Sequence, residues 1–129
     1  MGKKATVAAL SNPAVLLVDD DPSYLTALGD LFEYDPIRIL RAQSGLHALD
    51  RLRIEKVGVV VSDYWMRGMD GIQLLREVRR LYPSVRRVLL TGLPDSDLVL
   101  AARGHKVLTK DMQPDLIRRV ILREARRHA

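Results

Sequence analysis

The chain of 129 residues contains no cysteine, which excludes disulfide bonds, thiolate metal sites and thiol nucleophiles. It also lacks long hydrophobic runs. The longest apolar segments, such as residues 14–18, are far too short to span a bilayer, and the first ten residues lack a signal-peptide core. These absences predict a soluble protein with no membrane segment, and the missing cysteine fits a reducing, cytoplasmic compartment.

Aromatic residues are scarce, at 5% of the chain, and this bears on a basic segment at its end. The chain carries 21 Lys and Arg against 16 Asp and Glu, and residues 113–129 hold five arginines against Asp115 and Glu124. A basic helix can meet nucleic acid, an acidic partner or an anionic surface. No stacking aromatics are interleaved with these arginines, so the pattern favours a solvated helix face over a nucleic-acid contact.

The length and the apolar fraction of 47% are those of one domain with its own core. Residues 1–13 read as a flexible leader that ends at Asn12 and Pro13, and residues 14–129 as the domain. At its centre, residues 57–63 form an unbroken β-branched run, typical of a strand buried on both faces, that ends in one charged side chain, Asp63. The glycines and the aspartate that follow indicate a loop and then a helix start.

Segments with strand and helix patterns alternate along the domain. The helices have cap signals: Asp21 precedes Pro22, Ser44 precedes the second helix, and Asp70 with Gln73 forms a capping box. The second strand alternates in polarity, which suits a sheet edge. The predicted strands are residues 14–18, 37–40, 57–63, 85–90 and 106–109; the predicted helices are about 22–33, the segment with Leu46, Leu49 and Leu52, 71–81, about 95–103, and the segment from about 114. This alternation predicts a doubly wound, parallel α/β sheet of five strands and five helices.

Four of the five predicted strands end in polar groups: Asp19 and Asp20, Asp63, Thr91, and Lys110. The strand order 2-1-3-4-5, taken from the flavodoxin-like class of doubly wound folds, would bring these ends together at one edge of the sheet. Three carboxylates that lie close together repel one another unless a cation separates them. Oxygen donors without nearby histidine or cysteine favour Mg²⁺, with Mn²⁺ as the alternative.

Mg²⁺ is usually held by one or two carboxylates together with waters and a phosphate, which leaves a further carboxylate free to attack phosphorus. A hydroxyl and an ammonium, as on Thr91 and Lys110, suit the oxygens of a transferred phosphoryl group. The set therefore predicts a carboxylate that accepts a phosphoryl group.

These motifs, in this order and spacing, resemble those of response-regulator receiver domains of bacterial two-component signalling, the CheY-like superfamily. The segments that carry the resemblance are residues 16–22, 62–71, 90–92 and 108–110. By this resemblance Asp63 is the phosphoacceptor, Thr91 the switch hydroxyl and Lys110 the phosphate-pairing lysine. Asp19, Asp20, Asp63 and the backbone carbonyl of Trp65 would hold the metal.

Three positions and the length of one segment depart from the family pattern. Arg67 and Asp111 stand where the family has prolines, so we expect a looser loop after Asp63 and a trans peptide bond with a displaced loop after Lys110. The interval from Thr91 to Lys110 is about three residues short, and Val107 replaces a frequent aromatic. Trp65 and Leu93 occupy the two positions that flank the path of the hydrolytic water in the family, and their bulk predicts slow self-dephosphorylation.

The resemblance implies a switch rather than an enzyme. A sensor histidine kinase or phosphotransferase would phosphorylate Asp63, with self-catalysis by the receiver. The face formed by the fourth helix, the fifth strand and the last helix would then change for a downstream partner or a second copy in a homodimer. The alternative is a degenerate receiver that acts as a phosphorylation-independent interaction or dimerisation module, as the shortened fourth-helix region and the missing proline after Lys110 suggest.

Overall fold

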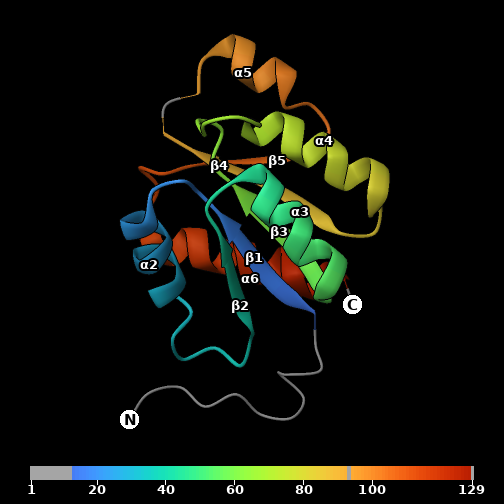
Figure 1. Ribbon diagram of the computed structural model, residues 1–129. Coiled ribbons are helices and arrows are strands. Elements are labelled where there is room, and N and C mark those ends of the chain that lie inside the picture. The colour runs from blue at the N-terminus through green and yellow to red at the C-terminus, as the bar shows by residue number, and fades with distance from the viewer. Residues whose placement is uncertain (1–12, 93, 129) are drawn as a thin grey trace.

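The protein folds around a five-stranded parallel sheet, seen in a computed structural model that describes residues 13–92 and 94–128 (Figure 1). Residues 1–12 of the predicted leader lie outside the described part. The strand order is β2-β1-β3-β4-β5, as the sequence predicts. The strands are β1 (Ala14–Val18), β2 (Ile39–Ala42), β3 (Val57–Ser62), β4 (Arg86–Thr91) and β5 (Lys106–Thr109). The order places β1 beside β3 at the centre of the sheet.

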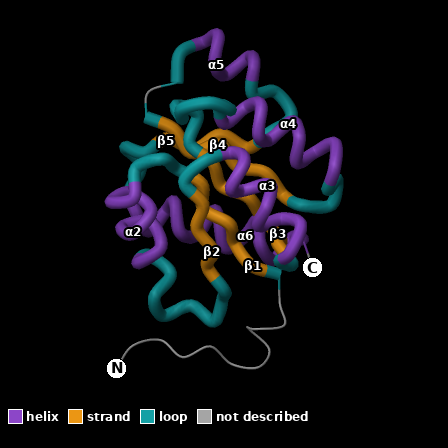
Figure 2. Tube along the Cα trace, in the orientation of Figure 1, coloured by secondary structure: helices purple, strands orange, loops and turns teal. Residues whose placement is uncertain are grey.

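The helices of the described residues cover the two faces of this sheet (Figure 2). They are α2 (Pro22–Asp30), α3 (Gly45–Ile54), α4 (Gly71–Leu81), α5 (Ser96–Ala101) and α6 (Pro114–His128). One core cluster joins the sheet to α3 and α4, and the other joins it to α2 and α6. The fold is therefore the three-layer, doubly wound arrangement that alternating strands and helices favour.

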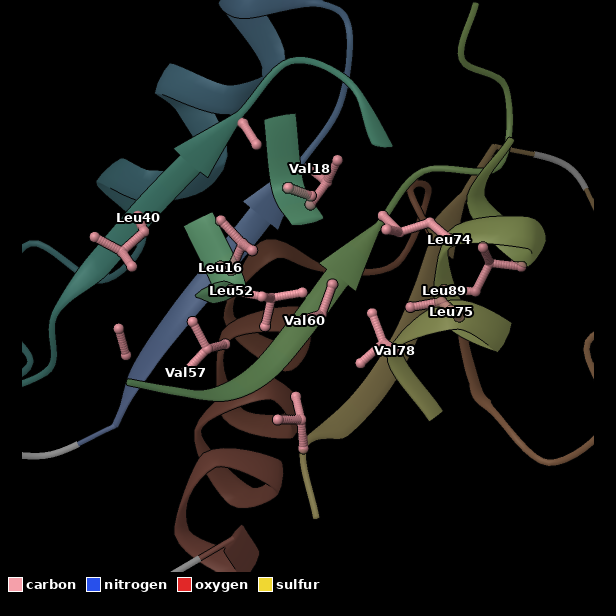
Figure 3. Close-up of a cluster of buried hydrophobic side chains, with 14 of the residues drawn as sticks. Leu16, Val18, Leu40, Leu52, Val57, Val60, Leu74, Leu75, Val78 and Leu89 are labelled. Carbon is pink, nitrogen blue, oxygen red and sulfur yellow. The ribbon is translucent and has the colours of Figure 1, made fainter. Parts of the chain in front are cut away.

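The central strands supply both clusters because neighbouring side chains of a strand point to opposite faces. Val15 and Leu17 of β1 lie in the cluster with α2 and α6, whereas Leu16 and Val18 lie in the other. Figure 3 shows the cluster on the side of α3 and α4, in which Leu74, Leu75 and Val78 of α4 pack against β3 and β4. Every residue of β1 and β3 is buried, as predicted for a strand covered on both sides.

Local signals set the helix starts more reliably than the ends. Asp21, Ser44, Asp70 and Asp95 each accept a hydrogen bond from a backbone N–H of the helix that follows, and α4 has the complete capping box. Some predicted bounds were wrong in detail: α2 ends at Asp30 rather than at about residue 33, and β2 covers Ile39–Ala42 rather than residues 37–40. Leu46 of α3 is exposed. Among the described residues, no helix is both long enough and apolar enough to cross a membrane.

Candidate functional site

The carboxyl ends of β1, β3, β4 and β5 bring the predicted polar residues to one edge of the sheet. Val18 pairs with Ser62, and Thr91 pairs with Thr109, so the residues that follow these strands start at equal heights. The backbone N–H of Asp63 donates to the carbonyl of Val18 at 3.0 Å, and that of Lys110 donates to the carbonyl of Thr91 at 2.7 Å. These bonds fix the backbones of residues 63 and 110 to the adjacent strands.

Lys110 lies between two buried carboxylates. Its Nζ is 2.8 Å from Oδ2 of Asp19 and 3.5 Å from Oδ2 of Asp63. Asp19 is 3% exposed and Asp63 8% exposed, so both acids have lost most of their hydration. A cation between them offsets a repulsion that would otherwise be strong in a medium of low polarity.

The pKa values of the pair follow from this burial. Burial raises the pKa of Asp63, and the charge of Asp19 raises it further, against the opposing charge of Lys110. Burial by itself lowers the pKa of Lys110, but the hydrogen bond to Asp19 and the charges of both aspartates raise it overall. Lys110 is therefore a firmly protonated partner for the groups at this edge of the sheet.

Asp20 faces a different neighbour. Its Oδ2 accepts a hydrogen bond from the backbone N–H of Arg67 at 3.1 Å, and the Nε of that side chain lies 3.9 Å away. Arg67 is 93% exposed, so it adds a solvated positive charge beside the acids. In the described part of the chain, no three His, Asp or Glu side chains are arranged to hold one metal ion together. The predicted set of three carboxylates is thus split between Lys110 and Arg67.

The donor chemistry of this edge nevertheless fits Mg²⁺. The residues offer carboxylate and carbonyl oxygens, and Mg²⁺ commonly takes only one or two protein carboxylates and keeps several waters. The ammonium already seated between Asp19 and Asp63 marks a position where positive charge is favourable. By the resemblance, Asp19, Asp20 and Asp63, with the carbonyl of Trp65, are the residues that would hold the ion.

The loop after β3 is fixed against the backbone of Asp63. The N–H of Gly71 donates to the carbonyl of Tyr64 at 3.0 Å, and a Cβ on Gly71 would lie 2.0 Å from the carbonyl oxygen of Asp63. Only glycine permits this approach of α4 to the acidic residue. Oδ1 of Asp63 accepts from the N–H of Tyr64 at 2.9 Å, which leaves Oδ2 directed at Lys110.

The loop after β5 keeps Lys110 in the site without a proline at residue 111. The described chain has no cis peptide bond, as predicted, but the expected displacement does not carry the ammonium away. The N–H of Met112 donates to the carbonyl of Thr109 at 3.1 Å, and the Thr109 hydroxyl donates to the Asp111 carboxylate. These two bonds close the turn that follows Lys110.

Tyr24 is a site residue that no sequence pattern indicated. The Nζ of Lys110 lies 4.1 Å from the centre of its ring, a cation–π contact that holds the ammonium on the side of α2. Burial raises the pKa of Tyr24, against the lowering effect of Lys110. Tyr24 is the third residue of α2, and nothing in its local sequence indicates this contact.

Thr91 and Trp65 differ in burial. Thr91 is 1% exposed at the end of β4, whereas Trp65 is 73% exposed and packs edge to face on Tyr64 with ring centres 4.8 Å apart. Leu93, the second residue predicted to shield the acceptor, lies outside the described residues. Val107 is only partly buried, against the cluster on the α3 and α4 side.

Ion pairs away from this edge occupy part of the basic helix α6. Arg118 binds Asp35 through two hydrogen bonds of 2.6 and 2.8 Å, and Arg119 pairs with Asp115 at 3.1 Å. Among the described side chains, Arg118 and Arg119 are therefore paired with the protein's own acids. The sequence-based preference for a solvated helix face over a nucleic-acid contact stays a prediction.

A family model described as the response regulator receiver domain matches residues 15–122. The chain is 34% identical over 110 residues to the transcriptional regulatory protein GlrR of Escherichia coli K12, covering 83% of this chain and 25% of that protein. The chain thus spans about a quarter of that relative. It is 27% identical to sporulation initiation phosphotransferase F of Bacillus subtilis 168, covering 81% of this chain and 85% of that protein.

Solved structures share the fold. The signal receiver domain of an HD domain-containing protein from Pseudomonas fluorescens Pf-5 is 32% identical, with a TM-score of 0.83 over 91% of this chain and 96% of that chain. A CheY-like receiver domain protein from Methanospirillum hungatei JF-1 is 20% identical, with a TM-score of 0.84 over 92% of this chain and 97% of that chain. The second likeness bears on the fold alone.

Proposed function

Because the chain belongs to the response regulator receiver domain family, we propose that it accepts a phosphoryl group on Asp63 and changes its surface in response. Members of this family are phosphoacceptors of two-component signalling rather than enzymes with a separate substrate. The observation that carries the proposal is the pairing of Asp63 with Lys110 in a buried acidic site at 3.5 Å. The donor would be the phosphohistidine of a sensor kinase or phosphotransferase.

The residues have separate roles in this transfer. Oδ2 of Asp63 attacks phosphorus, the bond from phosphorus to the donor nitrogen breaks, and the nitrogen leaves with the electron pair and is protonated. Lys110 neutralises the charge of one phosphoryl oxygen, and the Thr91 hydroxyl donates to another. A bound Mg²⁺ would supply charge neutralisation for the remaining oxygen. Positioning and charge account for the self-catalysed character of the step.

Strands β4 and β5 connect the site to the proposed output face. Thr91 ends β4 and Lys110 follows β5, so new bonds from these residues to a phosphoryl group would pull on both strands at once. The face made by α5, β5 and α6 then presents a changed surface to a downstream partner or to a second copy of the chain. Receiver domains that work with kinases of this kind do so in the cytoplasm, where we place this chain.

Beryllofluoride distinguishes this switch from a constitutive interaction module. With Mg²⁺ and beryllofluoride, a stable mimic of the aspartyl phosphate, we expect amide resonances of β4, α5 and β5 to shift in the wild type and not in Asp63→Asn. Shifts confined to residues next to Asp63 would contradict the switch. An unchanged wild-type spectrum would support the alternative of a degenerate receiver that binds its partner without phosphorylation.

The phosphorylated state should be long-lived because Trp65 stands two residues after the acceptor. A bulky side chain there would hinder the water that attacks phosphorus, so Trp65→Asn should shorten the lifetime of the phosphorylated domain by about tenfold, equal to about 1.4 kcal/mol of barrier. The decay is followed by mass spectrometry after removal of the phosphodonor. Trp65→Phe, which keeps an aromatic ring, is the control and should decay at the wild-type rate. Equal lifetimes for Trp65→Asn and the wild type would show that the indole only packs on Tyr64.

A further inference from the structure

A second polar recess lies at the opposite end of the sheet from Asp63. It has a volume of about 520 Å³ and is lined by the starts of β4 and β5, where Arg86, Arg87, His105 and Lys106 meet, and by Glu124 of α6. The volume falls in the range of small-molecule sites. Because parallel strands end together, the recess and the acidic site are separated by the length of β4 and β5.

Most of the positive charge at this recess has no acidic partner. Arg86 is the exception, since its Nε and Nη2 each lie 3.0 Å from Oε1 of the buried Glu124. Within residues 13–92 and 94–128, no ion pair of 4.0 Å or less joins an acid to Arg76, Arg79, Arg87 or Lys106. These residues therefore form a cluster of like charges that the described protein does not neutralise.

Arg87 is held in the recess by neutral acceptors. Its Nε donates to Nδ1 of His105 at 3.2 Å, and its Nη1 and Nη2 donate to the carbonyls of Val85 and Gly104 at 3.4 Å each. Burial, together with the charges of Arg79 and Arg86, lowers the pKa of Arg87. The guanidinium is thus fixed in place by the fold without a counter-charge.

The pKa of His105 reflects its burial and the positive charges around it. Burial and then the charges of Arg87, Arg79 and Arg76 lower its pKa to about 4. Since Nδ1 accepts a hydrogen bond from Arg87, the proton of the neutral ring is on Nε2, which makes the ring a donor. The imidazole, three unpaired arginines and Lys106 all offer hydrogen-bond donors or positive charge on this side of the molecule.

We propose that this recess binds the phosphate or pyrophosphate group of a small molecule. Arginine side chains bind phosphate oxygens through charge-assisted hydrogen bonds, and Lys106 adds a point charge. A phosphate group would relieve the repulsion among the arginines, which is the physical reason for binding. A small anion is favoured over a protein segment because the lining forms a concave recess of about 520 Å³, the size of a small-molecule site. The recess does not depend on the function proposed for Asp63.

The imidazole of His105 provides a readout that general attraction to a basic chain would not move. With inorganic pyrophosphate as the probe, the bound anion should raise the pKa of His105 from about 4 toward the ordinary value of about 6.5. Its ring resonances, followed by NMR from about pH 5 to pH 7, should then begin to titrate. His47, which is exposed on α3, is the internal control, and pyrophosphate should leave its ring resonances unchanged.

Variants separate the recess from the overall positive charge. Arg79→Gln combined with Lys106→Gln should weaken pyrophosphate binding about tenfold or more, because both side chains are exposed and unpaired. Arg53→Gln, an exposed arginine of α3 that pairs with Asp50, is the matched control and should bind as the wild type does. Amide spectra confirm that each variant is folded.

Three results would overturn the assignment. Equal weakening by Arg53→Gln and by the recess variant would mean attraction to net charge alone. Saturable binding without a change in the His105 titration would put the anion elsewhere on the chain. A His105 shift produced by an acidic peptide but not by pyrophosphate would make the recess a contact for a protein segment.

Discussion

Asp63→Asn is expected to abolish the gain of one phosphoryl group when the chain is incubated with acetyl phosphate and Mg²⁺. The amide cannot form the acyl phosphate, because its nitrogen is a poor nucleophile and its oxygen carries no full charge. The other carboxylates of the site are engaged, Asp19 by Lys110 at 2.8 Å and Asp20 by the Arg67 backbone at 3.1 Å. Mass spectrometry of the intact protein measures the gain.

Asp21→Asn is the matched control for this experiment. Asp21 lies beside the site in sequence but caps α2 through the N–H of Ser23 at 3.0 Å, and asparagine caps a helix about equally well. This variant should gain the phosphoryl group as the wild type does. A persistent gain in Asp63→Asn would assign the acceptor to another residue, and no gain in the wild type would favour the phosphorylation-independent module.

The substitution Asp63→Asn should also stabilise the fold at neutral pH. Burial and the charge of Asp19 raise the pKa of Asp63 above its value in the unfolded chain, so the folded state disfavours the ionised carboxylate. This cost is absent below the unfolded pKa, grows as the pH rises toward the folded pKa, and is complete above it. Asp63→Asn should therefore melt at a higher temperature than the wild type near pH 7, with a difference that vanishes in acid. A constant difference at all pH values would contradict this origin.

Lys110→Met should have the largest effect on stability among single changes at the site. It leaves Asp19 and Asp63 facing each other in a buried setting without the ammonium that lies 2.8 and 3.5 Å from them. Removing one partner of a buried ion pair costs about 3–5 kcal/mol, and we expect about 3 kcal/mol because Lys110 is 25% exposed. Chemical denaturation measures the loss.

Mg²⁺ tests whether the carboxylates can share a cation. If they hold the ion, adding Mg²⁺ should stabilise Lys110→Met more than it stabilises the wild type, because the ion replaces the missing positive charge and binds only the folded state. Lys56→Met, which alters an exposed lysine before β3, is the control and should change stability little. A loss of stability in Lys110→Met that Mg²⁺ leaves unchanged would contradict the proposed metal position. Beryllofluoride shifts in this variant should also be weaker than in the wild type.

The fold was predictable because its signals are local and agree with one another. The β-branched run before Asp63 is buried on both sides, and each helix that begins after a predicted cap starts where that cap indicates. Element ends were less predictable. The apolar pattern of α2 continues to Phe32, which is fully buried, although the helix ends at Asp30. Burial set the pattern, whereas the backbone of residues 31–33 continues as turns, in which each N–H donates to the carbonyl three residues earlier.

The environment of each site residue was not predictable in the same way. Tyr24 contacts Lys110 from another element, and Glu124 lies 38 residues from its partner Arg86. Nothing in the local sequence of either residue indicates these partners, because the distances depend on how α2 and α6 pack on the sheet. The exposure of Leu46 has the same cause, since the core clusters of the described residues engage Ala48 and Leu52 of that helix instead.

The sequence by itself determined the alternation of strands and helices and the kinds of polar groups at the strand ends, because hydrophobic periodicity and capping act over a few residues. The tertiary structure alone decided which of those groups share a neighbour: Lys110 joins Asp19 to Asp63, and Asp20 turns to Arg67. It also decided that arginines scattered over α4 and β4 crowd one histidine. Electrostatic energy depends on distances through space, and only the packed sheet and helices fix those.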